Sequence, residues 1–338
     1  MNRTLIALGC AACAANATAA TWTVDTNTGR PADFRSLQAA HDSASVHNGD
    51  VLHLIASPVS YGALNLTKPL TIIGPGYFLN QNLSFPVAAP SALTGTITFS
   101  PGSDGSLITG LEIAVVSCAG ANNLTIKRNY IQQSISVPSG TSSSNVGIFQ
   151  NYVTGDLNFK YIADGSNSGM TIRGNYVGGG VDFSKANDSG DFQFNIVHAD
   201  CELAHFYVAN NIIGGGLYVG PGSVVICNAW TSVNGPAPWP GTSPRWVLGT
   251  YHQWTSGADT FDAQFVSAVS TDARWKLKPD ATVKGIGTNG VDPGMFSGPD
   301  PYIISGLPAV PMVIGIQAPT SASAASGLPV TVTLQVNP

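Results

Sequence analysis

Four acidic side chains and one lysine give this sequence its clearest means of doing chemistry. They are Asp156, Lys160, Asp182, Asp200 and Glu202, and they occupy related positions of a pattern that repeats between residues 123 and 230. When two carboxyl groups lie close together, one raises the pKa of the other. A pair formed by Asp182 and Glu202 could therefore act as general acid and base at a glycosidic bond.

The same acids also suit a cation. Ca²⁺ takes about six to eight oxygen ligands, and Asp156, Asp182, Asp200 and Glu202 are the candidates. In a Ca²⁺-assisted polysaccharide lyase the ion neutralises a uronate carboxylate while a basic side chain removes the α-proton, and Lys160 is the candidate base. A third interpretation is that these residues are polar only because they face water. Like charges opposite each other on a sheet are mildly destabilising, which favours a ligand.

The pattern that would position these residues is centred on asparagine. Each of its six copies has one apolar residue three positions before the asparagine and another two positions after it. The asparagines are separated by steps of 22, 24, 20, 16 and 17 residues: Asn129, Asn151, Asn175, Asn195, Asn211 and Asn228. A repeat near twenty residues is typical of a stacked solenoid.

Asparagine has two properties that suit such a stack. At a strand spacing of about 4.8 Å, its amide can donate and accept hydrogen bonds in a ladder that runs along the solenoid. Asparagine also tolerates the left-handed backbone conformation, which we expect it to supply at a sharp turn between strands.

A second short strand follows each asparagine. Positions six and eight after the asparagine are apolar and should face inward, so position seven should face outward. The outward residues are Ser136, Asn158, Asp182, Glu202 and Tyr218. Neighbouring coils bring one column of residues within roughly 5 Å of each other, so Asp182 and Glu202 should be adjacent. Ser136, Asp156, Asn158 and Tyr218 are the predicted ligand-binding residues of the groove beside that pair.

Composition agrees with a protein of short strands and turns. The chain has 338 residues, of which only 10% are charged, and it contains 38 glycines and 22 prolines. A charged disordered chain is therefore excluded, and a net charge of −5 provides no basic face for nucleic acid. Residues 1–20 combine Arg3, an apolar run and a small-residue cleavage site, which predicts a signal peptide. No later segment is long enough for a transmembrane helix.

The predicted fold class is all-β, a parallel β-helix with a short N-terminal capping helix and a C-terminal β-strand extension. A stack of coils exposes its core and a strand edge at each end, and an amphipathic helix over 33–44, with Asp33 at its N-cap, can cover one end. The predicted organisation is a signal peptide at 1–20, a β-helix at 21–256 with asparagine-ladder coils at 106–230, a closing segment at 257–308 and a β-hairpin at 309–338.

Several stretches resemble secreted right-handed parallel β-helix proteins of the pectate-lyase-like kind. The stretches at the entry to the solenoid are Asp33–Leu37, Gly49–Val51 and Lys68–Leu79, and together with the asparagine pattern this resemblance covers about 30–230. Trp275–Pro279 and Gly298–Tyr302 resemble the exit segment of such proteins. The resemblance is closest to bacterial members of unassigned function. It implies a right-handed β-helix, secretion to the cell surface or the medium, and a polysaccharide in an outer groove. None of these motifs specifies a reaction.

Three functions fit these observations. The favoured one is an exported β-helix that binds an extracellular polysaccharide or another cell-surface component along its groove, with Ca²⁺ as the candidate cofactor. The second is a Ca²⁺-assisted polysaccharide lyase or a glycoside hydrolase that acts through Asp182, Glu202 and Lys160. The third is a structural surface or adhesin module whose C-terminal strands pair with a partner.

Overall fold

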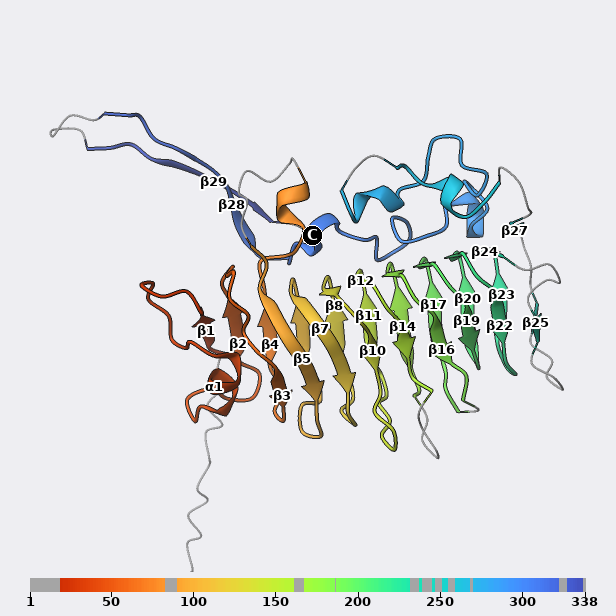
Figure 1. Cartoon of the computed structure of the whole chain (residues 1–338), viewed down its shortest axis with the longest axis horizontal. Helices are drawn as coiled ribbons and strands as arrows, with labels where there is room; N and C mark the ends of the chain where they lie inside the picture. Colours follow the sequence, from red (N-terminus) through yellow and green to blue (C-terminus); the bar gives the residue numbers. More distant parts are fainter. Residues whose placement is uncertain are drawn as a thin grey trace, which may run out of the picture.

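The described strands wind into one long parallel β-solenoid, which confirms the predicted fold class (Figure 1). The computed structural model describes residues 19–82, 90–160, 167–185, 187–231, 237–238, 245–246, 251–254, 259–267, 270–321 and 327–336. The predicted signal peptide lies outside the described residues except for Ala19 and Ala20.

One side of the solenoid is an 11-stranded sheet to which successive coils contribute one strand each. All of its pairings are parallel, in register from coil to coil. Its strands, in order, are β1 (Thr21–Val24), β2 (Val51–Leu54), β4 (Thr71–Ile73), β6 (Leu107–Thr109), β8 (Thr125–Lys127), β11 (Gly147–Phe149), β14 (Met170–Arg173), β17 (Gly190–Gln193), β20 (Phe206–Ala209), β23 (Val224–Ile226) and β26 (Arg245–Trp246).

The other two sides belong to a 16-stranded sheet that splits into two rows. The strands at the N-terminal end, two of them long, are β3 (Leu64–Leu66), β5 (Leu93–Phe99) and β7 (Glu112–Cys118). The row called the groove row contains β10 (Ile135–Ser136), β13 (Leu157–Asn158), β16 (Val181–Phe183), β19 (Cys201–Leu203), β22 (Leu217–Val219) and β25 (Ala237–Pro238). The row called the flank row contains β9 (Tyr130–Ile131), β12 (Tyr152–Val153), β15 (Tyr176–Val177), β18 (Ile196–Val197), β21 (Ile212–Ile213), β24 (Ala229–Trp230) and β27 (His252–Gln253).

The core follows the apolar positions of the repeat. The residues three before and two after each ladder asparagine are buried, as are those six and eight after the first five asparagines. Aromatic side chains stack within the core, since the Phe159 and Phe183 rings lie 4.4 Å apart and Phe206 packs on Phe183 at 5.2 Å. Burying a large apolar side chain contributes about 1.5–3 kcal/mol, so these columns hold the coils together.

The six asparagines form a hydrogen-bonded ladder inside the turn between the 11-stranded sheet and the flank row. All six are fully buried, and from Asn151 onward each Oδ1 accepts from both the backbone N–H and the side-chain amide of the preceding ladder asparagine. The amide-to-oxygen distances run from 2.9 to 3.2 Å. The ladder ends at Leu111, whose backbone N–H donates to Asn129 Oδ1 at 3.1 Å.

The left-handed conformation at this turn belongs to the residue before each ladder asparagine, so the prediction that the asparagine supplies it is wrong. The φ angles of these residues lie between 53° and 65°: Arg128, Gln150, Gly174, Phe194, Asn210 and Cys227. Because glycine fills only one of these six positions, five side chains tolerate the strain of this region. Because these positions repeat from coil to coil, the residues form one column along the solenoid, termed the turn column.

The N-terminal helix α1 (Leu37–Asp42) is shorter than predicted, and its predicted start at Asp33 is wrong. Ser36 caps it, whereas the Asp33 carboxylate accepts from the Thr23 backbone N–H. The helix buries Leu37 in the core. Two of its polar side chains accept hydrogen bonds from backbone N–H groups along the edge of β3. Gln38 Oε1 accepts from Asn65 N at 2.8 Å and His41 Nε2 accepts from Thr67 N at 3.1 Å. These bonds protect an edge strand that would otherwise be open to pairing.

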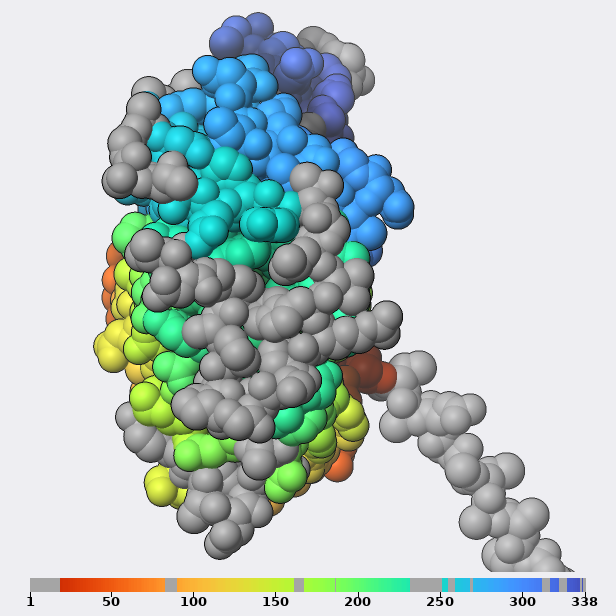
Figure 2. All heavy atoms as spheres, turned by 90° about the vertical axis from the view of Figure 1, so that its right-hand side faces the viewer, coloured from red at the N-terminus to blue at the C-terminus, as the bar shows by residue number. Residues whose placement is uncertain are grey.

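The closing segment runs along the flank row and back towards the N-terminal coils. Its short 3₁₀ turns are η2 (Asp262–Gln264), η3 (Ala273–Trp275), η4 (Thr288–Gly290) and η5 (Ile304–Gly306), and a further turn, η1 (Leu79–Gln81), precedes β5. Figure 2, which looks along the solenoid from its C-terminal end, shows this segment in cyan and blue over the coils. It shares a second buried cluster with the outward residues of the flank row: Tyr152, Tyr176, Ile196, Ile212 and Ala229.

Residues of the turn column bind this segment through hydrogen bonds at three places along its length. Asn210 Oδ1 accepts from Thr288 N at 2.7 Å, Gln150 Nε2 donates to Pro301 O at 2.6 Å, and Arg128 Nη1 donates to Leu307 O at 3.0 Å. Where the closing segment reaches the N-terminal coils, the hydroxyl oxygens of Tyr77 and Tyr302 lie 2.7 Å apart. The Tyr302 hydroxyl also donates to the carboxylate of the buried Asp272.

The C-terminal strands β28 (Pro311–Gln317) and β29 (Thr331–Val336) form a separate antiparallel pair. In the described residues they pair only with each other, and they extend away from the solenoid on the side of the closing segment (Figure 1). No helix among the described residues is both long and apolar enough to cross a membrane.

Candidate functional site

The predicted outward column lies on the outer surface of the groove row, in continuous register. Ser136 pairs with Asn158, Asn158 with Asp182, Asp182 with Glu202, and Glu202 with Tyr218. Their apolar neighbours on both sides in each strand are buried, so the alternation of the short strands turns these five side chains outward. The closing segment covers the flank row and leaves this surface open, with Tyr218 36% exposed.

Asp182, Glu202 and Lys160 form the charged centre of the column. Lys160 Nζ lies 3.5 Å from Asp182 Oδ2, and the Asp182 Oδ1 atom accepts from the Ser184 backbone N–H at 3.2 Å. Burial, and after it the neighbouring Asp182 carboxylate, raises the pKa of Glu202, although Lys160 opposes the rise. The lysine side chain is 45% exposed, so water screens its ion pair and the pair adds at most about 1 kcal/mol to stability.

A shallow depression of about 170 Å³ opens beside these three side chains. Its lining also includes Asp156, Asn158 and Asp200, so the structure gathers the predicted acids and the lysine around one hollow. Such a surface offers carboxylate acceptors, one amide and one ammonium donor to a ligand.

Asp156 and Asp200 have a structural role that the sequence did not reveal. Asp156 Oδ1 accepts from Gly180 N at 2.8 Å, and Asp200 Oδ1 accepts from Gly216 N at 2.6 Å. Each carboxylate thus binds the turn of the next coil. The glycines Gly179 and Gly215 make room for them, since a Cβ there would lie 2.1 Å and 2.4 Å from the respective Oδ1 atoms.

The Tyr218 ring packs close to Gly216, two residues earlier in the chain. A Cβ on Gly216 would come within 2.7 Å of a ring carbon and 2.9 Å of the hydroxyl oxygen, so only glycine leaves the ring this position. Tyr218 is 36% exposed at one end of the column. An exposed tyrosine side chain offers a ligand an apolar ring and a polar hydroxyl.

No group of three or more His, Cys, Asp or Glu side chains with the proximity needed for a metal ion is found within the part of the chain that the structure describes. Asp156, Asp182 and Asp200 each direct one oxygen at a backbone N–H, and Asp182 and Glu202 are partners in register on adjacent coils. The prediction of a Ca²⁺ site with Asp156, Asp182, Asp200 and Glu202 as ligands stays a prediction.

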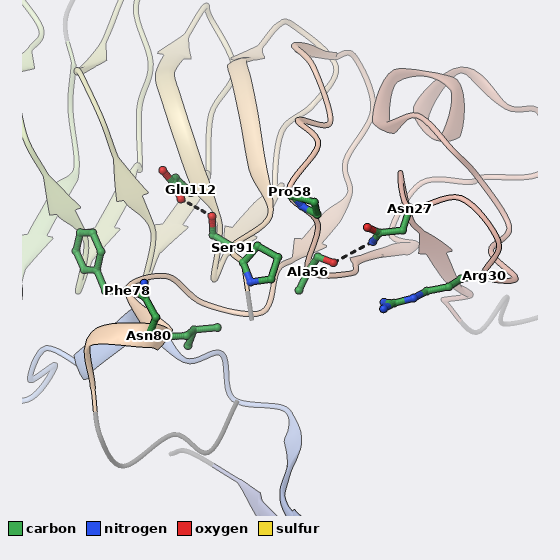
Figure 3. A pocket seen from close by; sticks show the side chains of 10 residues that line it. Asn27, Arg30, Ala56, Pro58, Phe78, Asn80, Ser91 and Glu112 are labelled. Carbon is green, nitrogen blue, oxygen red and sulfur yellow. Dashed lines mark hydrogen bonds between the residues drawn. The ribbon is translucent and has the colours of Figure 1, made fainter. Parts of the chain in front are cut away.

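A larger cavity lies elsewhere, at the N-terminal end of the solenoid. It has a volume of about 890 Å³ and lies between the loops that follow β1 and β2 and the segments around Phe78 and Ser91. Figure 3 shows Arg30 and Glu112 on opposite sides of it. The Glu112 carboxylate is held by the Ser91 hydroxyl and by Gln132 Nε2. No repeat of the sequence marks this cavity because loops of different coils enclose it.

Comparison of the chain with known family models and with curated proteins found no match to either. The structure confirms a parallel β-solenoid, whereas the closer resemblance to pectate-lyase-like proteins stays a prediction.

Proposed function

We propose that this protein binds a polysaccharide or another hydroxyl-rich cell-surface ligand along the groove row. The observation that carries the proposal is the continuous register of Asn158, Asp182, Glu202 and Tyr218 on a surface that the closing segment leaves open. A polymer chain suits this surface because successive coils repeat contacts at one strand spacing, roughly 4.8 Å.

The chemistry of the column favours hydroxyl groups. Carboxylates such as Asp182 and Glu202 accept hydrogen bonds, the Asn158 amide both donates and accepts, and Lys160 donates. The exposed ring of Tyr218 adds an apolar surface on which a sugar ring can stack. A uronate polymer would meet the acids unfavourably unless Ca²⁺ lay between them, so the two classes of ligand differ in their need for the ion.

Binding to immobilised neutral and acidic polysaccharides, each with and without Ca²⁺, tests the proposal. The double variant Asp182→Asn with Glu202→Gln should weaken binding at least about tenfold, or roughly 1.4 kcal/mol. The reason is that a hydrogen bond to a charged group contributes about 1.5–3 kcal/mol and one to a neutral group about 0.5–1.5 kcal/mol. Asp280→Asn removes an exposed carboxylate from the closing segment and is the matched control. If the double variant binds as tightly as the unmodified chain, the groove row is not the binding surface.

A catalytic function is the second candidate, and the contact of Lys160 with Asp182 beside Glu202 favours it. In a hydrolase, Glu202 with its raised pKa would donate a proton, and Asp182 would be the second carboxylate of the acid/base pair. In a lyase, Lys160 would take the α-proton of a uronate. Assays for new reducing ends and for the ultraviolet absorbance of an unsaturated product distinguish the two reactions, and binding without either product excludes both.

A further inference from the structure

A second hollow lies on the outer surface of the 11-stranded sheet. Its volume is about 330 Å³, and it is termed the sheet hollow. In β8, β11 and β14 the buried residues Ile126, Ile148 and Ile172 face the core, so the residues on either side of them face outward. Among the described residues, none lines both the sheet hollow and the depression in the groove row. The side chains and glycine that matter for its chemistry are Asn123, Thr125, Asn145, Gly147, Phe149 and Thr171.

An aromatic ring lies in the middle of the sheet hollow. Thr125, Gly147 and Thr171 are partners in register on three successive coils, and the Phe149 ring packs over Gly147 between the two threonines. A Cβ on Gly147 would lie 2.2 Å from a ring carbon, so only glycine leaves the ring this position. Phe149 is partly exposed and lines the hollow, so a ligand can reach its ring. Such a ring offers an apolar surface to a ligand.

Two asparagine side chains supply polar groups at the edge of the sheet hollow. Asn145 Nδ2 donates to Asn123 Oδ1 at 3.1 Å, and both residues are exposed. Within the described residues this is the only hydrogen bond of the two amides, so Asn123 Nδ2 is left as a donor and Asn145 Oδ1 as an acceptor. A donor and an acceptor fixed beside each other match two neighbouring hydroxyl groups of a sugar ring, because each hydroxyl can both donate and accept.

The charges of this surface favour a neutral sugar over an acidic one. None of the described residues that line the sheet hollow is charged. Lys127 and Arg173 are the register partners of Phe149 in the adjoining column. Arg173 lies 2.5 Å from a carboxylate oxygen of Asp191 and 3.9 Å from one of Asp300, so its charge is balanced by its own neighbours. The carboxylate of a uronate would therefore find no cation in the hollow itself, whereas a neutral sugar needs none.

We propose that the sheet hollow is a second carbohydrate site, which binds one neutral sugar unit. The apolar side of the sugar ring packs on Phe149, and its hydroxyls bond to the amides of Asn123 and Asn145. The volume of the hollow is at the lower end of the range for small-molecule sites, about 300–1,000 Å³. Together with the groove row, the protein would hold two polysaccharide chains at once. That consequence rests on the proposed function, but the sheet hollow itself does not.

Calorimetric titration with neutral oligosaccharides of glucose, mannose, galactose and xylose, and with an oligouronate, tests the proposal. The chain carries Asp182→Asn and Glu202→Gln, so that the groove row contributes little to binding. Phe149→Ala should then weaken the binding of a neutral oligosaccharide at least about fivefold. Thr171→Val keeps the shape of the side chain and removes its hydroxyl, which should weaken binding about two- to tenfold. Tyr207→Ala removes another exposed ring from the same sheet, three coils away, and should leave binding unchanged.

Equal losses in Phe149→Ala and Tyr207→Ala overturn the proposal, as does a failure of every neutral oligosaccharide to bind. Tighter binding of the oligouronate than of any neutral oligosaccharide overturns the assignment of a neutral sugar. Unchanged thermal unfolding shows that the sheet is still folded, and if Phe149→Ala unfolds at a lower temperature, Thr171→Val decides. In a chain with an intact groove row, binding that is lost only with Phe149→Ala contradicts the proposed function. Binding that is lost only with the groove-row variant contradicts this inference.

Discussion

Removing one asparagine from the middle of the ladder should destabilise the solenoid by several kcal/mol. The Asn175 Oδ1 atom accepts from Asn151 N at 2.9 Å and from Asn151 Nδ2 at 3.1 Å. Its own Nδ2 donates to Ile148 O at 2.8 Å, to Arg173 O at 3.1 Å and to Asn195 Oδ1 at 3.0 Å. Asn175→Ala deletes all five contacts at a fully buried site.

The size of the effect follows from the groups left behind. Asn151 N–H and the Ile148 carbonyl group lose their ladder partner, and a buried polar group without a hydrogen bond costs about 1–3 kcal/mol. The expected loss is therefore roughly 2–6 kcal/mol of unfolding free energy. Asn158→Ala removes the same residue type from the outward column and should change stability by less than about 0.5 kcal/mol.

Guanidinium unfolding followed by circular dichroism measures both variants. The ladder argument requires Asn175→Ala to unfold at a clearly lower denaturant concentration than Asn158→Ala. Equal midpoints for the two variants would show that the ladder amides contribute no more to stability than surface amides.

Two further predictions concern the groove row. Because the pKa of Glu202 is raised, the folded state binds its proton more tightly, and stability should fall as pH rises above the ordinary glutamate pKa of 4.5. Glu202→Gln should flatten this fall in thermal unfolding measured between about pH 4 and pH 7, and an unchanged pH profile would contradict it. Gly216→Ala should displace the Tyr218 ring and weaken glycan binding at least several-fold while the melting temperature changes little. Gly180→Ala, whose Cβ meets no ring, is its control, and equal binding by both variants would exclude a role for the ring position.

The sequence was sufficient to predict the solenoid because the asparagine pattern repeats in residue type as well as in spacing. The outward column could be predicted because side chains alternate strictly between the two faces of a strand and each coil contributes one such strand. The column contains Ser136, Asn158, Asp182, Glu202 and Tyr218. Knowing one repeat therefore fixed which side chains would meet across the coils.

A second column of buried polar residues was not predicted because its members differ in residue type. Asn167 Oδ1 accepts from Ser143 N at 3.2 Å, and Asp188 Oδ1 accepts from Asn167 N at 3.0 Å. The numbering steps are 24 and 21 residues, against 24 and 20 for the corresponding steps of the ladder, so this similar spacing was the only signal. Burial raises the pKa of Asp188, although these hydrogen bonds oppose the rise.

The predicted start of α1 and the predicted conformation of the asparagine turns were both wrong, and the reasons are local contacts. Both Asp33 and Ser36 can cap a helix, and the contact of Asp33 with Thr23 in β1 decided between them. At the turns, asparagine was expected to adopt the left-handed conformation, but a buried amide that bonds to two coils leaves that conformation to the preceding residue.

The return path of the closing segment fixes how many coils this protein can have. Solenoids commonly gain or lose repeats, because each coil contacts only its neighbours. Here Thr288, Pro301 and Leu307 are matched to Asn210, Gln150 and Arg128 on three different coils. An inserted coil would displace every match beyond it by one strand spacing, about 4.8 Å, so repeat number and the length of this segment can change only together.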